Sequence, residues 1–148
     1  MKVKDVLKRH LFTVKPNDNI KKAMQLLCYN KISGLPVIDD DNKLIGMISE
    51  KDILKAMYLS PQEYHEYGYA AYNDERYKDI MYNKVSTIMS STLITVNSDA
   101  AILKVASLML LNKVRRVAVV DKEGKLIDVI SQGDIHLAIF NKYLDDNN

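Results

Sequence analysis

The sequence contains a single cysteine, Cys28, among its 148 residues. One cysteine excludes a disulfide within the chain and is typical of a protein kept in a reducing compartment. An excess of charge of one sign is also missing, because 21 Lys and Arg residues stand against 19 Asp and Glu residues. The resulting net charge of +2 is small and evenly spread. It does not favour nucleic acid as a partner.

Long hydrophobic runs are absent as well. No apolar stretch approaches the ~18 residues that a membrane-spanning helix requires, and residues 1–5 lack the apolar core of a signal peptide. Hydrophobic residues still make up 47% of the chain and charged residues 27%, the balance of a folded globular protein. We therefore expect a cytoplasmic protein, with no membrane partner, that folds as one domain or as two small halves.

Motifs of catalysis and of metal binding are also missing. The three histidines, His10, His65 and His136, lie far apart in the sequence. No HExxH, CxxC, P-loop or catalytic pair of carboxylates occurs. Because an enzyme needs a nucleophile with its base or a metal cluster, we predict no enzyme, no required cofactor and no metal site.

What the chain does contain is an internal repeat. Residues 3–56 align without a gap to residues 85–138 at a shift of 82, with 19 identities over 54 positions. Chance would give about three or four at ordinary residue frequencies. Units of this size bury too little apolar surface alone, so two copies are expected to pack together. We divide the chain into a first repeat (1–59), a linker (60–84) and a second repeat (85–148).

Each repeat predicts the same order of elements, β-α-β-β-α. In the first, residues 11–14 form a short strand, Asn17 or Asp18 caps a helix, and residues 35–38 and 44–48 pair as a hairpin. The helix carries its apolar residues at a spacing of three and four, namely Ile20, Ala23, Met24, Leu27 and Cys28. Ser49 begins the last helix. The fold class is therefore α/β or α+β, with tandem repeats.

Two segments carry a resemblance to a known family. Residues 30–39 (NKISGLPVID) and 46–53 (GMISEKDI) resemble the middle and the end of a CBS repeat, named after cystathionine β-synthase, and residues 93–139 keep both signatures. The resemblance implies a Bateman module, in which two repeats pack about a pseudo-twofold axis. It also implies two clefts that take AMP, ADP, ATP or S-adenosylmethionine.

The sequence Ser-x-x-Asp occurs at the start of the last helix in both repeats, as Ser49 with Asp52 and Ser131 with Asp134. One reading is a capping box that satisfies the first N–H groups of the helix. The other is a ligand site, because a helix start favours a phosphate. The resemblance implies that Asp52 and Asp134 bind ribose and that both serines lie near phosphate. The two readings are compatible.

The start of the middle strand differs between the repeats. Arg115 and Arg116 stand in the second repeat where the first has Ser33 and Gly34. Guanidinium groups bind phosphate in two-point contacts, so the pair favours a phosphate site, although a surface pair or ion pairs with carboxylates remain open. The two clefts are therefore not equivalent.

Further candidate contacts follow from the same alignment. The apolar wall for an adenine ring is predicted at the beginning of the middle strands, and a hydroxyl follows each first strand. Core packing and turn capping are the alternatives. These residues are Leu35, Pro36, Val117 and Ala118 for the wall, and Thr13 and Thr95 for the hydroxyls. Asp128 stands in the place of Gly46 and is expected to crowd or repel a phosphate.

The linker is rich in tyrosine. Seven of the nine tyrosines lie between Met57 and Lys84, and residues 60–63 (SPQE) predict a helix start. We expect the rings to pack on the repeats or on a second subunit. Stacking on nucleic-acid bases is disfavoured, because few cations alternate with the rings.

The predicted function is a sensor. An adenine nucleotide shifts the population of arrangements of the repeats, and a second polypeptide or a homodimer reads the change. In the family that the sequence resembles, the last helices form the dimer interface, here residues 50–59 and 132–143. The alternatives are a dimerising interaction module with empty clefts, or a binder of S-adenosylmethionine or another adenosyl ligand. The protein partner is not identified.

Overall fold

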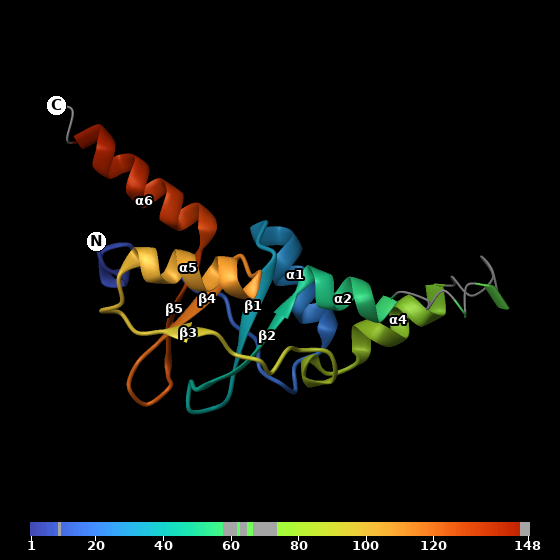
Figure 1. Cartoon of the computed structure of the whole chain (residues 1–148). Coiled ribbons are helices and arrows are strands. Elements are labelled where there is room, and N and C mark those ends of the chain that lie inside the picture. Colours follow the sequence, from blue (N-terminus) through green and yellow to red (C-terminus); the bar gives the residue numbers. More distant parts are fainter. Residues whose placement is uncertain (9, 58–61, 63–64, 67–73, 146–148) are drawn as a thin grey trace. The chain divides into compact units, whose positions relative to one another are not determined.

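The computed structural model describes residues 1–8, 10–57, 62, 65–66 and 74–145, and Figure 1 labels its main elements. The first repeat contains η1 (Val3–Asp5), α1 (Ile20–Asn30), β1 (Gly34–Ile38), β2 (Leu44–Ser49) and α2 (Glu50–Met57). The helix α4 (Asp74–Tyr82) follows. The second repeat contains η3 (Val85–Thr87), β3 (Thr95–Val96), α5 (Ile102–Asn112), β4 (Arg116–Val120), β5 (Leu126–Ser131) and α6 (Gln132–Asp145).

The predicted helix of the first repeat forms, but its cap is one residue later than expected. Ile20, Ala23 and Leu27 are buried on one face of α1, as their spacing predicts. The cap is Asn19, whose side chain accepts a hydrogen bond from the Lys22 N–H at 2.9 Å. Asp18 instead accepts from the Lys15 N–H in the preceding turn. Neither Asn17 nor Asp18 is therefore the N-cap.

The two repeats differ in their first strand. In the second repeat β3 pairs in parallel with β4, and β4 pairs antiparallel with β5. In the first repeat, residues 11–14 reduce to a single parallel bridge between Val14 and Val37. The cause is Pro36, which has no N–H to donate. Its counterpart Ala118 donates to the Ile94 carbonyl at 3.4 Å and so extends the ladder.

The compact units of the structure cut across the repeats in the sequence. Unit 1 comprises Met1–Leu11, Asp41–Leu44 and Thr92–Asn148, and unit 2 comprises Phe12–Asp40 and Ile45–Ser91. Each unit therefore takes its first short helix from the opposite repeat. The Val3 N–H bonds to the Ala100 carbonyl at 2.9 Å in unit 1, and the Val85 N–H bonds to the Asp18 carbonyl at 2.8 Å in unit 2.

Each unit has a hydrophobic core of its own. In unit 2 the core is formed by α1, α2, α4 and the β1–β2 hairpin, and Val85 lies fully buried in it. In unit 1 it is formed by α5, α6 and the β3–β4–β5 sheet, and Val3 lies fully buried in it. Each exchanged segment is thus part of the hydrophobic core of the unit that it joins.

Candidate functional site

Both Ser-x-x-Asp sequences form complete capping boxes. In unit 1, Asp134 Oδ2 accepts from the Ser131 N–H and from the Ser131 hydroxyl, both at 2.8 Å, and Ser131 Oγ accepts from the Asp134 N–H at 3.2 Å. In unit 2, Ser49 and Asp52 make the same three bonds at 2.9, 2.9 and 3.2 Å. The capping reading is therefore confirmed, and it occupies only one oxygen of each carboxylate.

The second oxygen distinguishes the two boxes. Asp134 Oδ1 forms an ion pair with Lys8 Nζ, and its side chain is only 12% exposed. Ser90 occupies the position of Lys8 in the other copy, so Asp52 has no equivalent cation there. Burial alone raises the pKa of Asp134, but the hydrogen bonds from Lys8 and Ser131 outweigh burial and hold it below the usual range. Asp134 is therefore an ionised acceptor at neutral pH.

The structure brings the start of each middle strand to its capping box. The Arg115 carbonyl accepts from the Gln132 N–H, and the Ser33 carbonyl accepts from the Glu50 N–H, both at 3.0 Å. Arg116 pairs with Ser131 in the β4–β5 register. In unit 1 the predicted arginines therefore lie beside Ser131, whereas in unit 2 Ser33 and Gly34 bring no charge to the corresponding place.

The residues predicted as an adenine wall are buried in their strands. Leu35 and Val117 belong to the two cores, and Pro36 and Ala118 are also buried. In this structure they can offer a ligand their backbone more readily than their side chains. Their contact with a ligand stays a prediction.

The two threonines lie at or beside the first strand of each repeat. Thr95 pairs with Ala118 in β3 and lines a pocket with Val120 and Asp121. Thr13 is half-buried and directly precedes Val14. Ser131 pairs with Arg116, two residues before Ala118 in β4, and the contact of either threonine with a ligand stays a prediction.

Asp128 has a structural role that the sequence did not reveal. It is 3% exposed, and its carboxylate accepts from the Lys8 N–H and from its own neighbour's N–H, that of Val129, both at 2.8 Å. A carboxylate with two such donors is directed at the backbone. The expectation that it crowds a phosphate finds no support in this geometry, whereas Lys8, which it positions, was missed.

The family model for the CBS domain matches residues 3–59 and 85–141. Both matches cover the capping boxes, the strand starts and the hairpins described above. The chain belongs to the CBS domain family. The matches also confirm the predicted tandem arrangement of β-α-β-β-α repeats as the fold class.

Curated relatives extend over most of this CBS pair. MJ1426, an uncharacterized protein of Methanocaldococcus jannaschii, is 34% identical, and the alignment covers 91% of this chain and 89% of the relative. The chloroplastic CBS domain-containing protein CBSX1 of Arabidopsis thaliana is 33% identical over 86% of this chain and 58% of its own length. The chain thus spans somewhat more than half of that plant protein.

Solved structures of CBS pairs share the fold and contain ligands. CBSX2 in complex with AMP has a TM-score of 0.76 and 30% identity, covering 96% of this chain and 98% of that one. The CBS pair of MJ0100, in complex with 5′-methylthioadenosine and S-adenosyl-L-methionine, has a TM-score of 0.75 and 25% identity, with the same coverage. These are the two ligand classes that the sequence resemblance names.

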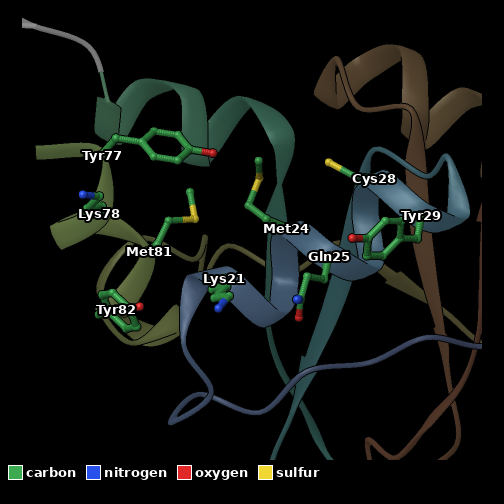
Figure 2. A pocket seen from close by; sticks show the side chains of 9 residues that line it. All are labelled: Lys21, Met24, Gln25, Cys28, Tyr29, Tyr77, Lys78, Met81 and Tyr82. Atoms are coloured by element: carbon green, nitrogen blue, oxygen red, sulfur yellow. The ribbon is translucent and has the colours of Figure 1, made fainter. Parts of the chain in front are cut away.

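The described end of the linker packs on the first repeat of the CBS pair. Helix α4 contacts α1 and α2, and α1 and α4 enclose a pocket of about 400 Å³. Figure 2 shows the side chains of Tyr77, Met81 and Met24 reaching into the space between the helices. Tyr77 and Tyr82 line this pocket but are 42% and 69% exposed, so the predicted packing of tyrosines on the repeats is partial in the described part of the linker. The predicted helix start at residues 60–63 and five of the tyrosines lie outside the described residues.

The described part of this CBS pair lacks two further kinds of feature. No group of three or more His, Cys, Asp or Glu side chains there is arranged to hold a metal ion. None of the helices in the same part combines the length and apolar character that crossing a membrane requires.

Proposed function

We propose that this CBS pair is a regulatory module that binds an adenine nucleotide and signals to a partner by conformational change. The observation that carries the proposal is the state of the two carboxylates. Each capping box uses only Oδ2; Oδ1 of Asp52 takes no part in its box, and Oδ1 of Asp134 pairs with Lys8, a partner that a ligand can displace. A ribose hydroxyl can donate to Oδ1, and its binding costs the helix none of its cap.

The two boxes favour different parts of a ligand. Lys8 and Arg115 bring positive charge to the Ser131–Asp134 box, which suits a phosphate. A ribose hydroxyl that approaches Asp134 competes with Lys8 for Oδ1, and the displaced ammonium is then free to meet the phosphate. The Ser49–Asp52 box has only Ser33, Gly34 and Ser90 at the matching positions. It therefore suits an adenosyl ligand of lower negative charge, such as S-adenosylmethionine.

The proposal includes no catalysis. The chain matches an inosine-5′-monophosphate dehydrogenase of M. jannaschii at 29% identity, but it spans only 23% of that enzyme. The enzyme's activity is therefore not carried over to this chain. The proposal also places the protein in the cytoplasm, which microscopy of the tagged protein tests.

Thermal unfolding with AMP, ADP, ATP and S-adenosylmethionine tests the proposal. A ligand at 100 times its Kd adds about 2.7 kcal/mol, a rise of roughly 5–10 °C in Tm for a chain of this length. We expect Asp134→Ala to abolish the rise in Tm that the phosphate-bearing ligand produces in the wild-type protein. The rise is taken relative to each variant's own Tm, because loss of the capping carboxylate costs about 1 kcal/mol.

Asp99→Ala is the matched control, since Asp99 is an exposed carboxylate that pairs with Lys2 and Lys4 and belongs to neither box. It should keep the full rise. If no adenosyl ligand raises Tm, the interaction module with empty clefts is favoured instead.

We further propose a homodimer as the route of the signal. Large apolar side chains are exposed on the last helices: Leu137 is 53% and Phe140 60% exposed on α6, and Leu54 is 51% exposed on α2. Burial of such side chains against a second copy is favourable. We expect Phe140→Asp to convert a dimer into a monomer in light scattering, whereas the exposed neighbour Asn141→Asp leaves the dimer intact. A wild-type monomer at all concentrations would contradict the proposal.

A further inference from the structure

A second pocket lies in unit 1, away from the capping box. It measures about 320 Å³ and opens where the parallel strands β3 and β4 end. Thr95, Asn97, Lys104, Val120 and Lys122 are among the residues that line it. Ser131 pairs with Arg116 at the opposite end of β4. The pocket is therefore separate from the proposed nucleotide site.

The other repeat provides an internal comparison for this pocket. At the equivalent place in unit 2, Lys15 forms an ion pair with Asp40, and Lys22 forms one with Asp18 at 3.1 Å. The pKa of Asp40 is lowered by its hydrogen bond from Lys15. Both lysines of unit 2 are thus neutralised by carboxylates of their own unit.

The second repeat has lost both of these carboxylates. At the shift of 82, Lys122 stands in the place of Asp40, and Ala100 stands in the place of Asp18. Lys104 keeps the position of Lys22, whereas Asn97 replaces Lys15. Two lysines therefore line the pocket of unit 1. The carboxylate that pairs with Lys22 in unit 2 has no counterpart beside Lys104, and Lys122 itself replaces the other carboxylate.

Two carboxylates remain nearby, and neither forms an ion pair with the two lysines. Asp121 also lines the pocket, but its Oδ1 accepts from the N–H groups of Glu123 and Lys125 at 2.8 and 2.9 Å in the hairpin turn. Asp99 pairs with Lys2 and Lys4. Within the described residues, neither Lys104 nor Lys122 has a carboxylate oxygen within 4.0 Å of its ammonium nitrogen.

Two ammonium groups that line one pocket repel each other, and an anion of two negative charges removes the repulsion. A phosphate group carries about −1.5 to −2 at neutral pH and three acceptor oxygens. Thr95 and Asn97 add a hydroxyl and an amide that can donate to those oxygens. The buried side chain of Val96 supplies an apolar floor, and the volume lies at the lower end of the range for small-molecule sites, ~300–1,000 Å³.

We propose that this pocket binds the phosphate group of a small phosphorylated molecule, held by Lys104 and Lys122. The site is independent of the proposed nucleotide site, and it exists in only one of the two repeats. The ion pairs of unit 2 exclude the same ligand from the equivalent place there.

Titration of the full chain with pyrophosphate, followed by calorimetry and by amide NMR, tests the proposal. We expect shifts at the amides of Thr95, Asn97 and Lys104, and an affinity that falls as salt rises. Lys104→Gln together with Lys122→Gln should weaken binding at least tenfold. Because both lysines are exposed and unpaired within the described residues, their loss should leave Tm unchanged.

Two controls separate this site from others. Lys15→Gln removes the paired lysine of unit 2 and should leave the affinity for pyrophosphate unchanged. The double change Asn97→Lys with Lys122→Asp rebuilds the ion pair of unit 2 inside unit 1 and should abolish binding. Asp134→Ala, which tests the nucleotide site, should not affect these shifts.

Three results would overturn the proposal. They are shifts confined to residues 115–134, an unchanged affinity in the double lysine variant, or citrate binding as tightly as pyrophosphate. The first would assign pyrophosphate to the nucleotide site. The last would show that the pocket binds anions by their charge and does not select phosphate.

Discussion

Replacing Val85 with aspartate is expected to unfold unit 2, although Val85 belongs to the second repeat by sequence. Val85 is fully buried and lies in the core of unit 2 with Ile20, Leu27 and Ile48. A carboxylate in this apolar core loses its hydration, so we expect a loss of about 4 kcal/mol or more. Native-state hydrogen exchange should show protection lost first in α1, β1 and β2.

Ser86→Asp is the matched control for this substitution. Ser86 is the next residue along η3 and is exposed, and its N–H bonds to the Pro16 carbonyl through the backbone, which the change leaves in place. The control should keep the protection of unit 2. Protection lost first from α5, β4 and β5 after Val85→Asp would show that Val85 supports the repeat to which its sequence belongs.

The exchange of first segments explains why part of the fold was beyond sequence reasoning. Val3 and Val85 are equivalent residues of the repeat, and both are buried. A unit built with its own segment and one built with the other repeat's segment bury the same residue type at the same place. Hydrophobic periodicity therefore predicts the elements but cannot assign the segment to a unit.

Local chemistry explains the smaller differences. Asn17, Asp18 and Asn19 are all good cap residues, and the choice of Asn19 depends on the turn in which Asp18 accepts the Lys15 N–H. The first repeat loses its first strand because Pro36 has no N–H to donate, and this proline was readable from the sequence. That the missing hydrogen bond is the one to the carbonyl of Phe12, the counterpart of Ile94, was not.

The candidate site was predicted in part. The Ser-x-x-Asp boxes follow directly from their spacing, because a helix start determines which N–H groups need a partner. Lys8 was missed, since it precedes the first repeat's strand and reaches Asp134 only because residues 1–11 belong to unit 1. No local pattern indicates a contact across 126 positions, so structure was required.

The second large effect is expected where the repeats differ at Gly46 and Asp128. In unit 2, Met47 and Ser90 exchange two backbone hydrogen bonds of 2.9 and 2.8 Å, which brings the segment after η3 directly onto β2. A Cβ atom at Gly46 would stand 3.0 Å from the Ser90 carbonyl oxygen and 2.7 Å from Met89 Sδ. Gly46→Ala is therefore expected to cost about 1–3 kcal/mol.

Gly46→Asp should cost several kcal/mol more than the alanine variant. The aspartate would be buried beside Ser90, whose N–H already donates to the Met47 carbonyl, so the new carboxylate lacks the donor that Asp128 finds at Lys8. Urea unfolding of both variants measures the difference. An aspartate variant as stable as the alanine variant would show that the segment around Ser90 separates from β2 to admit water.

Asp128→Gly is the reciprocal change, and its effect has a different origin. It opens space rather than filling it, and it leaves the N–H groups of Lys8 and Val129 without the oxygens that accept from them at 2.8 Å. An unpaired buried donor costs about 1–3 kcal/mol. Asp128→Asn keeps one acceptor oxygen and should lose less. If the glycine variant equals wild type in stability, the segment around Lys8 can pair with β5 through its backbone, as Ser90 does with Met47 in the other copy.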